Sequence, residues 1–479
     1  MQNSFIVLYL FLCCFACLGV EKLNAEPFEK NTGLKPRVIV LTDLKRVQET
    51  DDAASLVRLL TLADLVEIEG IIVSSGFNYW KPEHALEGYE LIWEMLDAYG
   101  NSVQNMMKMS LQKTFNLVED TQTIGYWPSV NYLRQRTALG TPMVGMSQVG
   151  NNFSNDGSRL ITSVIDESDP RPVYILVWGG GNVLAQAMWD ISENPLKKRS
   201  EYAVEAFVKK MRIISIGDQD ASWSDRSKPL DERNSHYWMR KKFPEMKWVM
   251  VSPGNFTRQS NQMQSFYQMH IQGHGALGNM YPDHSNSVEG DTPSLFYVLP
   301  LGMSDPEHPD WGSLAGIFAW TPHPKQSSAM VWSESVPGNE DFRKTSQDFT
   351  SRWIQPMWNL FAARADWARS ATGNRMPVAI VNGSKNGIPE VTAAAGSVFE
   401  ADATQSFDNE GDKLKFHWSL VPLATTAQDV VIDTPDKDKA KVIIPSNAAG
   451  KEIHLLLELT DDGAAHPLTV FRRIVIKVK

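Results

Sequence analysis

The chain has 479 residues, 43% of them hydrophobic, and a formal net charge of −10. This length allows two or three domains with a sizeable core. The acidic balance argues against nucleic acid and anionic membranes as partners. All three cysteines lie near the amino terminus, at Cys13, Cys14 and Cys17. The rest of the chain therefore has to fold without a disulfide.

Residues 1–25 are typical of a secretory signal peptide. Residues 5–20 are nearly all apolar but too few to span a membrane comfortably, and Ala25 provides a small residue before cleavage. Cys17 follows Phe15-Ala16, which makes it a poor site for a lipoprotein anchor. We expect export to the periplasm or beyond the cell, with no membrane span. The sequence indicates no oligomeric state.

Residues 37–76 predict a strand, a loop, a helix and a second strand. Residues 38–41 and 68–73 are apolar runs typical of strands buried on both faces. Apolar residues recur at helical spacing from residue 53 onward. Acidic residues follow the first strand and begin the helix: Asp43, Glu49, Asp51 and Asp52.

These acidic residues predict a ligand site, because open α/β sheets bind ligands at the carboxyl ends of their strands. Crowded carboxylates repel one another unless a cation or a proton relieves them, and hard oxygen ligands suit Ca²⁺. A structural explanation is also open for Asp51 and Asp52, because acidic groups in a first helical turn complement the helix dipole. It does not account for Asp43 at the strand end.

The pattern continues as an α/β domain over residues 36–370. Strands are predicted at 173–178, 211–216 and 247–251, and helices at 82–99, 159–165, 182–189 and 345–369. The last helix would close the domain. Residues 224–240 are charged and irregular, which predicts a surface insertion.

Polar residues and glycines follow several of these strands. Asn78 stands between aromatic residues, which suits contact with a sugar, although a purely structural loop is equally open. Gly179-Gly180-Gly181 has neither a Walker lysine nor the GxGxxG spacing, so phosphate binding is not favoured. His274 and His284 are too far apart for a helical zinc pair, so zinc is not predicted. A histidine bonded within a loop is the alternative for His274.

The pattern changes after a linker at residues 371–377. Short alternating runs separated by turns lie at 378–381, 397–401, 413–419, 441–444, 453–460 and 469–478. They predict a small all-β, immunoglobulin-like sandwich over residues 378–479.

Five motifs carry a resemblance to a known family. They are Thr42-Asp43, Glu49-Thr50-Asp51-Asp52 with the following Ser55 to Leu60, Asp218-Gln219-Asp220, Glu289-Gly290-Asp291-Thr292-Pro293-Ser294, and Asp305-Pro306-Glu307-His308-Pro309-Asp310-Trp311. With them the first domain resembles the nucleoside-hydrolase-like domain of exported bacterial proteins described as cellulose-binding. The sandwich resembles the C-terminal domain of the same proteins.

The resemblance implies residue roles, because nucleoside hydrolases bind Ca²⁺ with a DxDxxxDD motif at the first strand end. Asp43 would bind Ca²⁺ and take the proton of the attacking water. Asp52, Asp291 and the backbone carbonyl of Trp178 would be further Ca²⁺ ligands. The candidate substrate-binding residues are Asp51, Asn78, Asp218, Gln219, Asp220, His274 and Glu289.

The sequence departs from that motif at two places. Leu41 stands where the motif has its leading Asp, and four extra residues at about 45–48 lengthen the gap between Asp43 and Asp51. Extra loop residues are tolerated cheaply and can bulge outward. They can equally displace Asp52 from the metal.

Two functions follow from this reading. The first is a secreted, calcium-dependent hydrolase of a glycosidic or N-glycosidic bond in cell-wall saccharides, with carboxylates that stabilise an oxocarbenium-like transition state. The second is a non-catalytic carbohydrate-binding protein on the same scaffold. Export argues against a nucleoside salvage enzyme.

Overall fold

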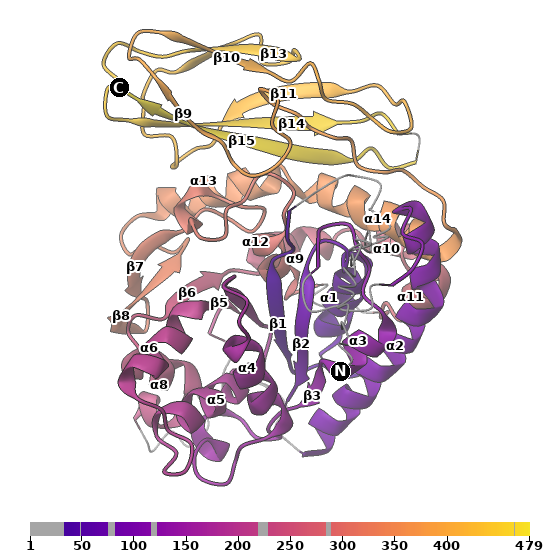
Figure 1. Ribbon diagram of the computed structural model, residues 1–479, viewed down its shortest axis with the longest axis vertical. Coiled ribbons are helices and arrows are strands. Elements are labelled where there is room, and N and C mark those ends of the chain that lie inside the picture. The colour runs from indigo at the N-terminus through magenta and orange to yellow at the C-terminus, as the bar shows by residue number, and fades with distance from the viewer. Residues whose placement is uncertain are drawn as a thin grey trace, which may run out of the picture.

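The computed structural model describes residues 33–47, 49–74, 82–115, 122–218, 229–283, 289–463 and 465–479. These residues form an α/β domain and a smaller all-β domain that packs on one end of it (Figure 1). Among the described residues, no helix combines the length and the apolar character that a membrane crossing requires.

An eight-stranded sheet, with the order β3-β2-β1-β4-β5-β6-β8-β7, forms the centre of the α/β domain. Its strands run parallel except in the β7–β8 hairpin at one edge. The strands are β1 (Arg37–Thr42), β2 (Glu67–Val73), β3 (Thr137–Leu139), β4 (Val173–Val177), β5 (Met211–Ile216), β6 (Lys247–Val251), β7 (Ala319–His323) and β8 (Gln326–Ser333). The five strands predicted from apolar runs are present, whereas β3 and the hairpin were not predicted.

Helices cover both faces of the sheet, which is why its central strands are apolar throughout (Figure 1). Val38 and Val40 of β1 face one helical layer, and Ile39 and Leu41 face the other. The first layer contains α1 (Thr50–Thr61), α2 (Pro82–Met109), α3 (Val130–Gln135), α9 (Gly254–Ser260), α10 (Gln264–His270), α11 (Gly275–Asn279), α12 (Thr292–Val298), α13 (Glu340–Ser351) and α14 (Ile354–Ser370). The second contains α4 (Asp156–Asp166), α5 (Asn182–Ser192), α6 (Glu201–Lys210) and α8 (Ser235–Lys242), with α7 (Leu230–Arg233) and the 3-10 turn Gly145–Gln148 beside it.

Two helical predictions were wrong in detail. The helix expected over 345–369 is divided into α13 and α14 at a turn that contains Trp353, whose indole packs against Phe349 and against Phe471 of the second domain. Residues 224–228 of the expected surface insertion at 224–240 lie outside the described residues, and the prediction is wrong for the described part, because α8 begins at Ser235 and buries His236 and Arg240. Both side chains contact Asp218 inside the protein. The charged character of this segment therefore did not indicate that they are buried.

The second domain has two sheets, with the orders β10-β13-β12 and β11-β14-β15-β9. Its strands are β9 (Glu390–Ala393), β10 (Val398–Asp402), β11 (Lys415–Leu420), β12 (Val431–Asp433), β13 (Lys439–Ile443), β14 (Glu452–Thr460) and β15 (Thr469–Val478). The expected strand at 378–381 is wrong, because this segment makes only isolated bridges. The strands β9 and β12 were not predicted, and β9 joins β15 in parallel.

The segment after α12 joins the two domains at the amino edge of the main sheet. Glu307 accepts hydrogen bonds from Tyr174 and Arg212, near the starts of β4 and β5. Arg473 of β15 is fully buried and donates to the carbonyl oxygens of Met303 and Gly312 at 2.7 and 3.0 Å. The motif at 305–311 therefore lies at the junction, far from the carboxyl ends of the strands.

Candidate metal and substrate site

The strand order reverses between β1 and β4, and this reversal marks where an open α/β sheet binds ligands. Asp43 follows β1, and Trp178 follows β4. The Trp178 backbone N–H donates to the Leu41 carbonyl oxygen at 2.8 Å, which fixes the two strand ends together. A Cβ on Gly179 would lie 2.1 Å from Asp43 Oδ1. Only glycine therefore allows the Asp43 carboxylate to lie against this turn.

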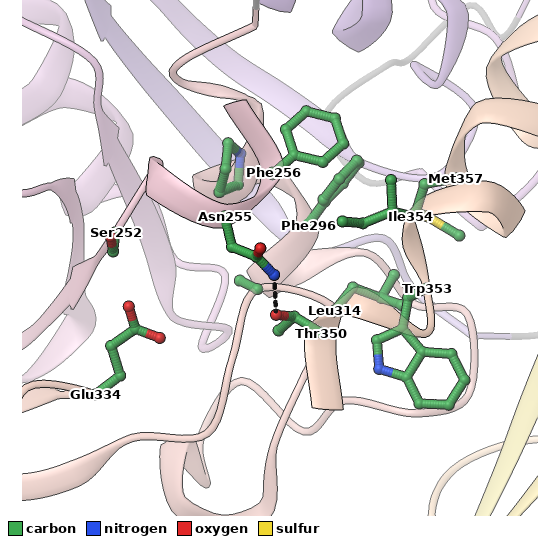
Figure 2. A pocket seen from close by; sticks show the side chains of 12 residues that line it. Ser252, Asn255, Phe256, Phe296, Leu314, Glu334, Thr350, Trp353, Ile354 and Met357 are labelled. Atoms are coloured by element: carbon green, nitrogen blue, oxygen red, sulfur yellow. Dashed lines mark hydrogen bonds between the residues drawn. The ribbon is translucent and has the colours of Figure 1, made fainter. Parts of the chain in front are cut away.

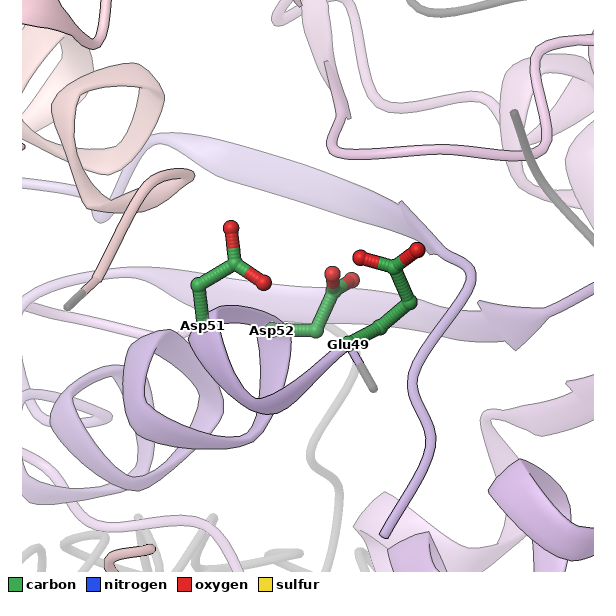
Figure 3. Close-up of side chains that lie close together, drawn as sticks. All are labelled: Glu49, Asp51 and Asp52. Atoms are coloured by element: carbon green, nitrogen blue, oxygen red, sulfur yellow. The ribbon is translucent and has the colours of Figure 1, made fainter. Parts of the chain in front are cut away.

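Five carboxylates gather at this point, and we call Asp43, Glu49, Asp51, Asp52 and Asp291 the acidic cluster. They come from the end of β1, the start of α1 and the residue before α12. Figure 3 shows Glu49, Asp51 and Asp52 side by side at the start of α1, where one oxygen of each lies within 4.8 Å of the others. Glu49 was predicted as part of this carboxylate cluster but was assigned no role as a metal ligand or substrate contact.

Burial and mutual repulsion dominate the electrostatics of the cluster. Asp43, Asp52 and Asp291 are 4%, 2% and 1% exposed. Burial raises the pKa of each well above its usual value, and the other acidic residues of the cluster raise it further. The charges of Asp43 and Asp291 raise the pKa of Asp52, and that of Asp43 raises the pKa of Asp291, so the three carboxyls share one region, whereas the oxygens that lie within 4.8 Å of one another are those of Glu49, Asp51 and Asp52. The structure thus brings Asp291 to residues more than two hundred positions earlier in the sequence.

The donor set fits a hard divalent cation. Both side-chain oxygens of Asp291 are buried, and the Asp52 carboxyl is the one side chain among the described residues whose hydrogen bonding lowers the pKa of Asp291. Asp52 accepts a hydrogen bond from the Thr42 hydroxyl. Lys45 is the one cation whose charge lowers the pKa of Asp43 within the described chain. One ammonium group against five carboxylates leaves negative charge that protons or a bound cation must balance.

The extra residues after Asp43 bulge away from the cluster. Val47 is 81% exposed, and Arg46 forms an ion pair with Glu94 of α2. The Arg46 backbone N–H also donates to Glu87 at 3.1 Å. Asp43 and Asp52 both remain buried at the ends of this loop. Gln48 lies outside the described residues.

Asp218 follows β5 and is held by three basic side chains. Arg240 donates to both of its oxygens at 2.9 and 3.0 Å, and ring nitrogens of His236 and His323 lie 3.1 Å from it. Burial raises its pKa, but the two histidine hydrogen bonds and the Arg240 charge outweigh burial and hold the pKa well below its usual value. Asp218 is therefore a fixed, ionised acceptor.

His236 connects Asp218 to the glycine turn. A Cβ on Gly181 would lie 2.1 Å from His236 Nε2, so the ring packs directly on the turn that also borders Asp43. Sequence reasoning missed His236, His323 and Arg240, because they come from segments without a recognisable pattern.

Other predicted contacts lie elsewhere. Glu289 is fully buried, binds Arg58 at 2.5 and 3.0 Å, and accepts from Tyr281 and Thr292, so it connects α1 to the start of α12. His274 lies beside α14, with Nδ1 3.2 Å from Asp366. Asn78, Gln219, Asp220, residues 1–25 and Cys17 fall outside the described residues.

Two hollows lie near the carboxyl edge. A groove of about 390 Å³ runs past the start of α1, between Arg46, Ala53 and the segment 278–283. The second hollow, drawn in Figure 2, is an enclosed space of about 20 Å³ between Ser252, Phe296 and Glu334. The second has room for about one water molecule, so only the groove is large enough to admit part of a saccharide.

Comparison with known proteins identifies the scaffold. Residues 37–318 match the nucleoside hydrolase-like domain of the cellulose-binding Sde182 family, and residues 398–478 match the C-terminal domain of cellulose-binding protein Sde0182. The chain belongs to this family. The Sde182-type architecture, with its α/β domain and C-terminal β domain, was predicted from the sequence motifs and is confirmed.

Solved structures agree with the assignment to the Sde182 family. A nucleoside hydrolase-related hypothetical protein from Saccharophagus degradans, described as associated with carbohydrate metabolism, is 30% identical with a TM-score of 0.76. The match covers 93% of this chain and 100% of that one. An endo-β-1,4-mannanase from Thermotoga petrophila is 10% identical over 93% and 98% of the two chains, but its TM-score of 0.17 supports no inference. No curated protein matches the sequence.

Proposed function

We propose that this chain is an exported, calcium-dependent hydrolase of a glycosidic or N-glycosidic bond in cell-wall-derived saccharides. The proposal rests on the acidic cluster at the reversal of strand order, where the charges of Asp43 and Asp291 act on Asp52 and both Asp291 oxygens are buried. The family description and the relative associated with carbohydrate metabolism support a saccharide as the substrate.

Different residues of the chain have different roles in this proposal. Asp43, Asp52, Asp291 and the Trp178 carbonyl would hold Ca²⁺, which when bound supplies positive charge that orients sugar hydroxyls and acidifies water. Asp43 is the proposed base, as the resemblance to nucleoside hydrolases implies, because its carboxylate directly follows β1 at the reversal of strand order. The ionised cluster would stabilise an oxocarbenium-like transition state.

The substrate contacts are a separate part of the proposal. Asp51, the half-buried member of the cluster, would accept hydrogen bonds from sugar hydroxyls. Both oxygens of Asp218 already accept from Arg240, so Asp218 would act through Arg240 and His236. Asn78, Gln219, Asp220, His274 and Glu289 remain predicted contacts. Glu289 would act through Arg58 and α12, since its oxygens already accept bonds from protein donors.

A non-catalytic carbohydrate-binding protein is the second candidate. Leu41 replaces the leading Asp of the motif and is fully buried in the core. The carboxyl edge of the sheet therefore lacks the first carboxylate of the DxDxxxDD motif. The description of the family as cellulose-binding also favours this candidate.

A substrate panel separates the candidates. Defined cell-wall oligosaccharides, inosine and uridine would be incubated with the purified chain, with Ca²⁺ or with a chelator. We expect turnover of a saccharide that requires Ca²⁺ and that falls at least about 100-fold in Asp43→Asn, since general bases contribute about 10²–10⁴-fold.

Asp341→Asn is the matched control, because Asp341 is exposed on α13. It should retain full activity. Saccharide binding without turnover on any substrate would establish the binding protein instead, and turnover of nucleosides alone would establish a nucleoside hydrolase.

A further inference from the structure

A cavity of about 580 Å³ lies between the two domains, and we call it the junction pocket. Its wall combines residues 33–34 and 300–302 of the α/β domain with residues 376–379, 385–388 and 470–472. Gly33 and Leu34 precede β1, whereas Asp43 follows it. The six residues of β1 place the two sites about 20 Å apart. The junction pocket is therefore separate from the acidic cluster.

The pocket has the size and wall of a ligand site. Ligand pockets of about 300–1,000 Å³ are commonly found at domain interfaces and are mainly apolar with a few polar groups. Leu34 and Phe407 in the wall are 47% and 46% exposed. The Phe407 backbone is fixed by two hydrogen bonds with Val378, at 2.8 and 3.1 Å. Its half-exposed ring is thus a rigid surface on which a sugar ring can stack.

Arg472 gives the wall a buried positive charge. The described residues include six buried arginines, and four of them, Arg37, Arg58, Arg240 and Arg364, contact carboxylates directly. The charges of Asp305 and Asp310 act on a fifth, Arg473. Arg472, 4% exposed, instead donates to the carbonyl oxygens of Gly387 and Asn386 and to Ser384.

None of the carboxylates in the described part of the chain compensates this charge. Burial alone lowers the pKa of Arg472, to about 10. The residues that line the junction pocket in the described chain include Lys385 and Arg472 but neither Asp nor Glu. A buried guanidinium with only neutral partners is costly. An alternative role for Arg472 is to hold the loop at 384–387 in place. That role alone does not require the neighbouring pocket to lack acidic residues.

We propose that the junction pocket binds a saccharide that carries an oxyanion, with Arg472 facing the anionic group and Phe407 stacking on the ring. The buried Nε–H of Arg472 has no hydrogen-bond partner among the described residues. An arginine N–H donates equally well to a carboxylate and to a sulfate oxygen, so a uronate and a sulfated sugar are the two sources of this chemistry. The pocket would give the chain a binding site for acidic polysaccharide that does not depend on turnover at the acidic cluster.

Calorimetric titration of the full mature chain tests this proposal. The probes are a diuronic acid, a disaccharide sulfate and the matching neutral disaccharide. We expect one or both acidic probes to bind at least tenfold more tightly than the neutral one, with an affinity that falls as salt is raised. Equal affinity for all three probes would overturn the proposal.

Variants locate the site. Arg472→Met should weaken the acidic probe at least tenfold while Arg472→Lys retains part of the affinity, and Phe407→Ala should weaken it several-fold. Arg199→Met, which removes an outer ion pair, and Asp43→Asn, which lowers turnover at the other site, should leave the affinity for the acidic probe unchanged. If Arg472→Met fails to fold, Phe407→Ala still decides, because its ring is half exposed. Full binding in Phe407→Ala, or loss in Asp43→Asn, would contradict the proposal.

Discussion

At the amino edge of the central sheet, carboxylates contact basic side chains, whereas in the acidic cluster at the carboxyl edge the carboxylates raise one another's pKa values. Burial raises the pKa of Glu307 at the amino edge, but Arg212 and Lys247 outweigh burial and hold that pKa below its usual value. At the carboxyl edge, burial and acidic neighbours together raise the pKa of Asp291. The paired charges hold elements in place, and the carboxylates that repel one another mark the part of the sheet suited to a cation.

The largest expected effect comes from breaking a pair at the amino edge. Arg37 is fully buried and contacts Glu69 at 2.5 Å. Arg37→Met would leave the Glu69 carboxylate buried without that partner, which costs about 3–5 kcal/mol in the free energy of unfolding. Arg199→Met, which breaks an outer pair with Asp166, should cost less than about 1 kcal/mol. Equal losses in urea unfolding would contradict the expectation that the buried Arg37–Glu69 pair at the amino edge holds its elements in place more strongly than an outer pair does.

The second effect concerns the carboxyl edge. A cation that binds only the folded chain adds about 2.7 kcal/mol at a hundred times its dissociation constant. Ca²⁺ should therefore raise the melting temperature of the wild-type chain and of Asp341→Asn. It should have little effect on Asp52→Asn or Asp291→Asn. A calcium response that survives in both variants would place the ion elsewhere.

A third test concerns a histidine at the domain junction. Burial, the Arg473 charge and His308 lower the pKa of His454 to about 3. Below about pH 6.5 His454 binds a proton in the unfolded chain but not in the folded chain. His454 therefore does not affect the free energy of unfolding above that pH, and it lowers this free energy progressively as pH falls toward 3. From pH 7 to 5.5 the wild-type chain should lose about 1 kcal/mol more than His454→Gln. Parallel pH profiles of unfolding would contradict this.

The smallest effect reverses the usual sign of a core substitution. Asp291→Asn removes one buried charge from a group of like charges. It should stabilise the metal-free chain by about 1 kcal/mol, the scale of one unit of pKa. Chemical unfolding in a chelator measures this difference. Destabilisation by the same amount would mean that the Asp291 charge is already compensated in the absence of metal.

Much of the fold could be predicted because its central strands are buried on both faces. In an α/β chain, continuous apolar runs predict strands that are buried on both faces, and these runs formed β1, β2, β4, β5 and β6. The β7–β8 hairpin lies at the sheet edge with several exposed residues, so its sequence has no such run. The helix α8 escaped prediction because its buried polar residues are satisfied by distant partners such as Asp218.

The candidate site could be predicted only where local position indicates it. Asp43 at a strand end and Asp52 at a helix start are local signals, whereas Asp291 was identified only through the resemblance to a family. The bonding of Asp218 by Arg240, His236 and His323 depends on how three segments fold together. Arg472 differs from the other buried arginines only in what surrounds it, which no sequence pattern reveals.

A crystal structure of the chain grown with Ca²⁺ tests the account most directly. The account predicts one ion at the end of β1, with oxygens of Asp43, Asp52 and Asp291 at about 2.3–2.6 Å from it. Calcium bound away from Asp291, or crystals in saturating Ca²⁺ whose three carboxylates face only water or protein, would contradict it.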